Sequence, residues 1–178
     1  MRNAITRRGF GEAAFGAAIG TAGVATFRHA GAASLAQPTE RSILTITGRI
    51  TTTNKADAAQ FDRPMLEALG MFGFVTTTPW DDGPVHFEGV RMDRLMREVG
   101  ATGDTVSAYA ANDYSVDIPM EDFARYDVLL ALRRDGEYMT ARNKGPLFII
   151  YPYDSHPELK TRQYYSRSAW QVVRLVVK

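Results

Sequence analysis

The sequence contains no cysteine among its 178 residues, and this absence excludes several kinds of chemistry. Without thiols the chain can form no disulfide, no thiolate nucleophile and no thiolate metal site. Histidine is almost as scarce, since only His86 and His156 follow residue 36, and they stand seventy positions apart. No histidine pair has the short spacing that is typical of metal sites, so we predict that the chain has no metal site.

Motifs of two common enzyme classes are also missing. No serine lies in a G-x-S-x-G sequence, so the nucleophile elbow of a hydrolase triad has no support. Gly70 and Gly73 have no G-x-G-x-x-G pattern around them, so no phosphate-cradling turn is indicated. The chemistry of this chain must therefore be sought in other residues.

The N-terminal segment has the features of an export signal. Thr6-Arg7-Arg8-Gly9-Phe10 is a twin-arginine signature, and an uncharged run rich in alanine and glycine follows over residues 13–27. The alternative, a transmembrane anchor, needs about 20 strongly apolar residues, and this run is shorter and weakly apolar. Small residues suit cleavage near Ala36, with a second candidate at residues 30–32. We predict a twin-arginine signal over 1–36, a domain over 37–178 and a periplasmic location.

The charge balance of the domain argues against nucleic acid as a partner. The signal contains Arg2, Arg7, Arg8, Arg28 and Glu12, so the rest of the chain has 17 basic and 19 acidic residues, a net charge of −2. Binding to nucleic acid is typical of strongly basic domains. A domain of this size can bury a core without disulfides.

Strand patterns outnumber helix patterns in the predicted domain. Asp62 is a typical N-cap and Gly70 a typical helix end, so the residues between them favour a short helix. No regular alternation of strand and helix appears, and there is no repeat or linker, so we predict a single α+β domain. Strands are predicted over 42–50, 71–78, 105–110, 115–118, 127–132, 145–151 and 170–177, and helices over 62–70, 92–99 and 122–126. Asp135-Gly136 predicts a hairpin turn, and residues 152–162 are predicted to form a loop.

Candidate site residues lie where predicted elements end. Thr76 to Thr78 and Trp80 close the second predicted strand with hydroxyls and an indole. Asn112-Asp113-Tyr114 offers a carboxylate and a phenol, although an Asx turn explains this passage equally well. Arg142 and Lys144 beside a hairpin suit an anion clamp or a solvated face. An aromatic group near the C-terminus suits a pocket wall or a core edge; its members are Tyr151, Tyr153, Tyr164, Tyr165 and Trp170.

The order of several short passages resembles the molybdopterin-binding domain of the sulfite oxidase family. Phe87-Glu88-Gly89-Val90 after Trp80 is similar to the family's tryptophan and "W-x-G-V-P-L-x-x-L-L" passage. Residues 111–119 are similar to its "A-x-D-x-Y … P" passage. Residues 129–152 resemble "L-A … G … G-x-P-L-R … P", and residues 170–177 its closing strand. The resemblance spans nearly all of the domain and implies a sulfite-oxidase-like fold, mostly strands with short helices.

The departures from the family pattern concern its chemistry. Relatives place a cysteine that ligates molybdenum about a dozen residues before the glycine that corresponds to Gly89. This chain has Thr76 or Thr77 at that place. A neutral hydroxyl is a poor substitute for a soft thiolate on such a metal. Phe148 replaces an arginine that would face the pterin phosphate, and Asp154 brings a carboxylate into that neighbourhood. Arg91 replaces the proline after the glycine and valine.

The resemblance implies a molybdopterin-binding oxidoreductase domain, and the missing cysteine predicts the loss of sulfite-oxidase-type turnover. If a pterin binds, we expect it at Thr77, Trp80, Asn112, Asp113, Tyr114, Arg142 and Lys144. The alternative is a binding module without catalysis on the same scaffold, for a small ligand or a membrane-bound partner such as a periplasmic sensor.

Overall fold

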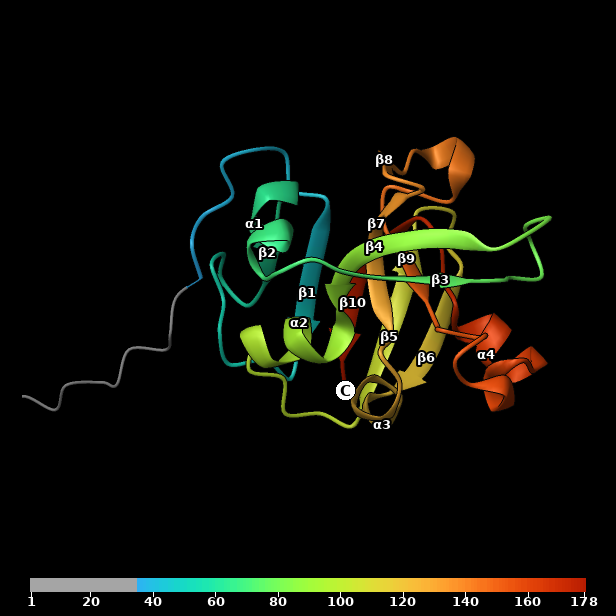
Figure 1. The fold of residues 1–178 in the computed structure, drawn as a ribbon. Helices are drawn as coiled ribbons and strands as arrows, with labels where there is room; N and C mark the ends of the chain where they lie inside the picture. Colours follow the sequence, from blue (N-terminus) through green and yellow to red (C-terminus); the bar gives the residue numbers. More distant parts are fainter. Residues whose placement is uncertain (1–34) are drawn as a thin grey trace, which may run out of the picture. The chain divides into compact units, whose positions relative to one another are not determined.

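Two β-sheets share one hydrophobic core in the computed structural model, which describes residues 35–178 (Figure 1). The first sheet has the strand order β2-β1-β10-β5-β6, and the second has the order β3-β4-β7-β8, with β9 also paired to β7. The strands of the first sheet are β1 Leu44–Gly48, β2 Ala59–Phe61, β5 Thr105–Ala110, β6 Ser115–Pro119 and β10 Val172–Val177. Those of the second are β3 Phe72–Thr76, β4 Val85–Arg91, β7 Leu129–Arg134, β8 Glu137–Tyr138 and β9 Phe148–Ile150.

Neighbouring strands run antiparallel except β1 and β10, which are parallel. This pair joins the first strand of the domain to its last strand, so the middle of the first sheet is formed by the two ends of the domain. Short helices occupy the connections between strands (Figure 1). They are α1 Arg63–Ala68, α2 Met92–Glu98, α3 Met120–Arg125 and α4 Arg162–Arg167, with single 3-10 turns η1 Ala141–Asn143 and η2 Pro157–Leu159. The predicted α+β architecture of mostly strands with short helices is confirmed.

The export signal predicted over 1–36 lies outside the described residues, apart from Leu35 and Ala36. Leu35 is buried, and its backbone N–H donates to the Thr53 carbonyl at 3.2 Å. The Asn54 side chain donates to the Ala36 carbonyl at 2.8 Å. No helix among residues 35–178 has the length and apolar character that crossing a membrane requires.

Local signals in the sequence predict several elements correctly. The Asp62 carboxylate caps α1 by accepting from the Met65 N–H at 2.9 Å, and Leu66 is buried beneath the helix. The β7–β8 hairpin turns at Asp135 and Gly136, which both have positive φ angles, as a tight hairpin turn of this kind requires. Most of the predicted strands are also confirmed, although β9 is shorter than the predicted range 145–151.

The short strands β2 and β8 lie outside the predicted strand ranges, and two further elements differ from the sequence prediction. The residues before α2 form the seven-residue strand β4, whose pairing with β7 shifts register between Glu88 and Gly89. This irregularity interrupts the alternation that identifies a strand in sequence. Helix α4 lies just after a segment that was expected to be loop, and it is only six residues long. Such a short helix is stabilised by its tertiary contacts rather than by intrinsic propensity.

Gly89, the glycine of the family-like passage, permits a close approach of β4 to β7. A Cβ atom at this position would lie 2.1 Å from the Leu130 carbonyl oxygen. No side chain fits at that distance, so glycine is required here for steric reasons.

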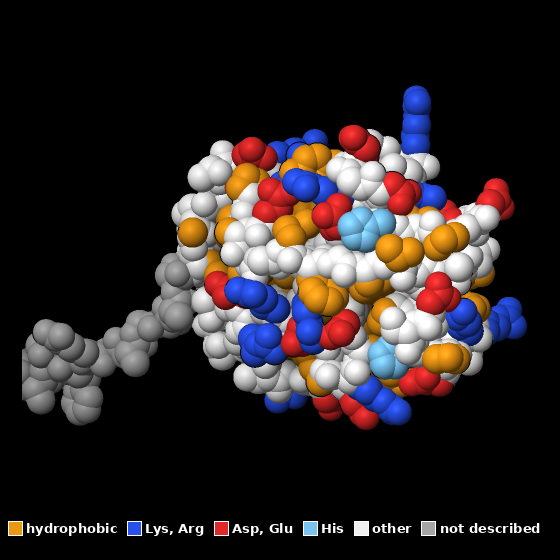
Figure 2. All heavy atoms as spheres, in the orientation of Figure 1, with side chains coloured by type: hydrophobic (Ala, Val, Ile, Leu, Met, Phe, Trp, Pro, Cys, Tyr) orange, Lys and Arg blue, Asp and Glu red, His pale blue; other side chains and the backbone are white. Residues whose placement is uncertain are grey.

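The face of the molecule seen in Figure 2 has charged side chains of both signs.

Candidate functional site

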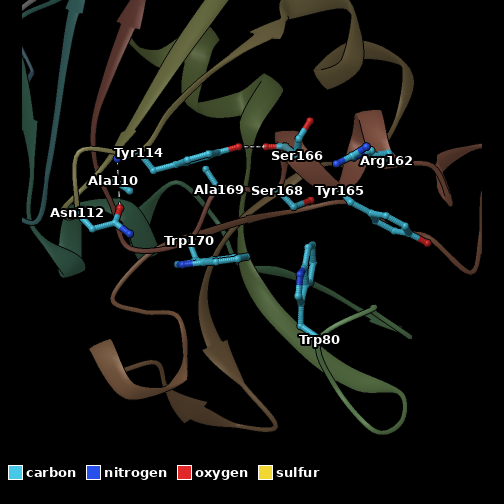
Figure 3. A pocket seen from close by; sticks show the side chains of 10 residues that line it. All are labelled: Trp80, Ala110, Asn112, Tyr114, Arg162, Tyr165, Ser166, Ser168, Ala169 and Trp170. Carbon is cyan, nitrogen blue, oxygen red and sulfur yellow. Dashed lines mark hydrogen bonds between the residues drawn. The ribbon is translucent and has the colours of Figure 1, made fainter.

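A cavity of about 300 Å³ lies between the β3–β4 loop, the β5–β6 turn and the segment around α4. We call it the aromatic cleft, because two indoles and two phenols are among its walls (Figure 3). Its volume is at the small end of the range for ligand sites, which suits a compact organic molecule. Ten residues line it: Trp80, Ala110, Asn112, Tyr114, Arg162, Tyr165, Ser166, Ser168, Ala169 and Trp170.

Trp80 is the centre of the aromatic wall. Its ring packs edge to face on Trp170 with centroids 5.6 Å apart, on Tyr165 at 5.9 Å and on Phe148 at 6.1 Å. Contacts of this geometry are favourable beyond the burial of area and hold the rings in fixed orientations. The cleft therefore presents a rigid aromatic surface rather than a flexible one.

The β5–β6 turn supplies a second wall. The Tyr114 N–H donates to the Asn112 side-chain oxygen at 3.3 Å, and Asp113 adopts a positive φ angle, so the Asx turn expected from the sequence is present. The Tyr114 hydroxyl donates to the Ser166 carbonyl at 2.7 Å (Figure 3). This bond ties the turn to α4 and fixes the phenol along one side of the cleft.

Arg162 is the single charged residue among the ten that line the cleft. It is exposed and makes no ion pair within residues 35–178. No carboxylate lines the cleft to neutralise it. The site thus combines flat apolar walls with one available guanidinium group.

A buried carboxylate positions α4 and therefore Arg162. The Asp122 carboxylate accepts from the Tyr151 hydroxyl at 2.7 Å and from the Arg167 guanidinium at 2.8 Å. Burial, followed by the Asp122 charge, raises the pKa of Tyr151 far above its ordinary value, so the phenol stays protonated and donates. The three side chains join α3, the residue that follows β9, and α4. A further bond between the hydroxyls of Tyr153 and Ser168, 2.6 Å apart, fixes the segment after α4.

Thr76, the last residue of β3, and Thr77, which follows it, are hydrogen-bonded to the loop after β9. The Thr77 N–H and hydroxyl donate to the two carboxylate oxygens of Asp154 at 2.6 and 2.7 Å. The buried Thr76 hydroxyl accepts from the Asp154 N–H at 3.1 Å. Lys160 donates to the same carboxylate at 2.6 Å. We call Thr76, Thr77, Asp154 and Lys160 the rim clamp, since they join the end of β3 to the loop after β9.

The rim clamp should weaken in acid. The hydrogen bond from Lys160, and next the one from Thr77, lower the pKa of Asp154 from 3.8 to about 2. A carboxyl group with a lowered folded-state pKa contributes stability that is complete above the unfolded value and is lost as pH falls through the folded value. We expect Asp154→Asn to be less stable than the unchanged protein at neutral pH, and the difference to shrink between about pH 4 and pH 2.

Thermal unfolding followed by circular dichroism across that pH range measures this difference. Asp57→Asn is the control, because Asp57 is exposed and its side chain has no hydrogen bond within the described part of the chain. If the two variants showed the same pH dependence, the rim clamp would have no role in stability.

Asp81 binds Lys144, one of the two cations predicted for an anion clamp, together with Arg134. Its carboxylate accepts from Thr78 at 2.7 Å, from Arg134 at 2.7 Å and from Lys144 at 3.3 Å. Burial opposes ionisation of Asp81, but the bonds from Thr78 and Arg134 and the charge of Lys144 outweigh it and lower its pKa. Lys144 therefore forms an ion pair with Asp81 within the domain. Arg142 is exposed on η1 and does not line the cleft.

The structure brings three of the predicted site residues together and keeps the others apart. Trp80, Asn112 and Tyr114 line the aromatic cleft. Thr77 belongs to the rim clamp, Asp113 is exposed in its turn, and Arg142 and Lys144 lie by the β7–β8 hairpin. Tyr165 and Trp170 from the predicted aromatic group also line the cleft, whereas Tyr151 and Tyr153 are fully buried. Arg162 was not predicted as a site residue, because the sequence predicts a loop at that position whereas the structure has the start of α4.

Residues 44–154 match the family model described as "Oxidoreductase molybdopterin binding domain". The chain belongs to this family. The solved structure of the sulfane dehydrogenase SoxCD from Paracoccus pantotrophus is similar to this domain in fold, with a TM-score of 0.58 and 18% sequence identity. The match covers 75% of this chain and 37% of the SoxCD chain, so this chain spans well under half of that relative. No curated protein matches the sequence.

The aromatic cleft of this molybdopterin-binding domain fits an organic ring system better than it fits a metal. Flat aromatic walls and an available arginine suit a planar group that bears an acid. The residues at the positions of the family's metal-ligating cysteine offer no suitable donor to molybdenum. The chain has no thiol, and the Thr77 hydroxyl already donates to Asp154. No three histidine, aspartate or glutamate side chains within residues 35–178 are grouped so that they could hold a metal ion.

Two further departures from the family pattern have structural partners in this domain. Phe148, which stands where relatives have an arginine, is buried against Trp80 and Phe87. Arg91, in place of a proline, forms ion pairs with Asp93 at 3.1 Å and Asp127 at 2.7 Å. Both substitutions are thus integrated into packing or ion pairs.

Proposed function

We propose that this domain is a periplasmic binding protein that holds a planar aromatic ligand with an acidic group in the aromatic cleft, without oxidising substrates at molybdenum. The observation that carries the proposal is the combination of rigid aromatic walls with one unpaired cation, Arg162. A pterin phosphate belongs to this class of ligand, as do other fused heteroaromatic rings with a carboxylate or phosphate.

The walls favour a ring over an extended aliphatic ligand. The ring of Trp80 already packs edge to face on Tyr165 and Trp170, and Tyr114 lines the same cavity. A ring inserted into the cleft therefore gains aromatic contacts without moving these side chains. The planar guanidinium of Arg162 can bind a carboxylate or phosphate through two parallel hydrogen bonds. Because few side chains must be ordered on binding, the cost in entropy is small.

The rim clamp supports the proposal that the domain does not oxidise substrates at molybdenum. Either threonine that corresponds to the metal-ligating cysteine of relatives is bound to Asp154: the Thr77 N–H and hydroxyl donate to its carboxylate, and the Thr76 hydroxyl accepts from its N–H. A negative carboxylate at this place repels an anionic thiolate or oxo ligand rather than stabilising it. Turnover of the sulfite oxidase type therefore has no group here to anchor its metal.

Export is supported by the sequence of residues 1–36 and is testable by fractionation. The burial of Leu35 in the described domain favours cleavage after Ala32 over cleavage near Ala36, because the later cut would remove this contact. N-terminal sequencing of protein from the periplasm, compared with an Arg7→Lys/Arg8→Lys variant that blocks the twin-arginine route, decides both points.

Ligand binding is tested by titrating tryptophan fluorescence with pterin-6-carboxylate and with unsubstituted pterin. We expect the anionic probe to bind at least about tenfold more tightly, which is the effect of one charge-assisted hydrogen bond. Arg162→Gln should remove this preference. Arg49→Gln, which changes an exposed arginine outside the cleft, should retain it. Equal affinity for both probes in the unchanged protein would contradict the role of Arg162, and no binding of either would contradict the proposal.

The absence of bound molybdenum is tested by elemental analysis of protein produced in a host that makes molybdenum cofactor. We expect far less than one molybdenum per chain for the unchanged protein and for Thr77→Cys. In the latter the Asp154 carboxylate raises the thiol pKa and disfavours the thiolate. The double variant Thr77→Cys/Asp154→Asn removes that obstacle and is the one expected to gain metal. Stoichiometric molybdenum in the unchanged protein would overturn this part of the proposal.

A further inference from the structure

Strand β3 forms an unprotected edge of the second sheet. Within residues 35–178 its single strand neighbour is β4, so one side of its backbone is left unpaired by the sheet. No charged residue occurs between Glu67 and Asp81, a run that contains the whole strand, and its single proline, Pro79, lies beyond the end of β3. Such edges bind other strands readily unless charge, proline or a bulge protects them.

The other sheet edges in the described domain are protected. β2 has three residues and β8 has two, one of them Glu137. β6 carries Asp117 and ends in Pro119. Only β3 is both uncharged and five residues long, which makes it the exception among the edges of this fold.

Large apolar side chains accompany the open edge. Met71 is 37% exposed, Phe72 42% and Val75 57%, and these are three of the six large hydrophobic residues that the described domain exposes. Hydrophobic side chains are visible on the face seen in Figure 2. Single exposed apolar residues are common, but three within five positions of one edge strand indicate a surface that is covered in the functional state.

The charges that flank β3 have opposite signs at its two ends. Arg94 lies near the beginning, where its guanidinium would be 3.0 Å from a Cβ placed on Gly70. Asp82 lies in the loop that follows the strand. Both are exposed, and neither has an ion pair within residues 35–178. An antiparallel copy of the same strand would bring the basic end of one β3 near the acidic end of the other.

We propose that β3 pairs antiparallel with β3 of a second copy of this chain, which forms a two-fold dimer with one continuous sheet across the interface. A two-fold axis through the middle of the strand places each neutral edge against an identical neutral edge. Phe72 and Val75, which lie on opposite faces of the strand, each lose exposed surface to neighbouring side chains of the other copy. The backbone hydrogen bonds supply affinity, and the flanking Arg94 and Asp82 select the antiparallel orientation.

Sedimentation equilibrium or light scattering after gel filtration tests the dimer with a matched pair of lysine variants. Val75→Lys puts a charge on the β3 edge and should give a monomer. Val173→Lys changes the other exposed valine, which lies on β10 in the first sheet, and should leave a dimer. Circular dichroism of both variants separates loss of pairing from loss of folding. A monomeric unchanged protein at concentrations well above micromolar, or a folded Val75→Lys dimer, overturns the proposal.

A charge exchange tests the orientation. Arg94→Glu and Asp82→Lys should each weaken the dimer several-fold at low salt, and the combination of both in one chain should restore it. The combination restores dimerisation only if the two positions face each other across the interface. Additive weakening in the double variant would exclude the antiparallel arrangement.

Discussion

Replacing Asp122 with alanine is expected to lower the free energy of unfolding by about 3–5 kcal/mol, because it leaves the Arg167 guanidinium without its partner. Both side chains are largely buried, with 8% and 15% of their surface exposed. The Tyr151 hydroxyl loses its acceptor in the same step. Thermal unfolding should shift downward by about 10 °C or more for a domain of this size.

Asp127→Ala is the matched control for this experiment. It also removes a carboxylate from an arginine, Arg91, but that ion pair is partly exposed and Arg91 keeps Asp93 as a second partner. Exposed pairs contribute about 1 kcal/mol or less. We further expect the Asp122 variant to lose affinity for the anionic pterin probe, since α4 carries Arg162. If both variants unfolded at the same temperature, the buried carboxylate would not hold α4.

Gly89→Ala is expected to destabilise the domain by about 3 kcal/mol or more. The new methyl group would overlap the Leu130 carbonyl oxygen, so β4 would have to move away from β7 in the middle of the second sheet. Denaturant unfolding measures the loss, and expression at low temperature provides folded material.

Gly83→Ala provides the comparison for this variant. Gly83 belongs to the loop between β3 and β4, and no atom lies within 4 Å of the position that its Cβ would take. The same chemical change should therefore leave stability within about 0.5 kcal/mol of the unchanged protein. Equal effects of the two substitutions would mean that close packing of β4 on β7 is not the reason for glycine at position 89.

The parts of this fold that could be predicted from sequence are those with local causes. Asp62 caps a helix three residues away, and Asp135-Gly136 makes a turn from adjacent residues. Strand β4 was missed because its register shift at Glu88 and Gly89 breaks the alternation. The cause of that shift lies across the sheet in β7.

The site was predictable to the extent that its residues end an element. Trp80, Asn112 and Tyr114 follow strands and were identified for that reason. Thr77 and Asp154 are 77 positions apart, so no spacing rule could join them. Arg162 reaches the cleft through contacts of α4 with Asp122 on α3, and sequence patterns contain no signal for such a contact.

The segment that follows the family match has a consequence for how this protein could acquire new specificity. Six of the ten residues that line the aromatic cleft lie at positions 162–170, beyond the matched range 44–154. More than half of the residues that line the cleft are thus encoded by a stretch of the gene that is separate from the matched domain. Mutations in the short C-terminal stretch can alter what the cleft accepts while the inherited sheets stay intact. Grafting residues 162–170 between relatives would be a direct way to exchange ligand preference.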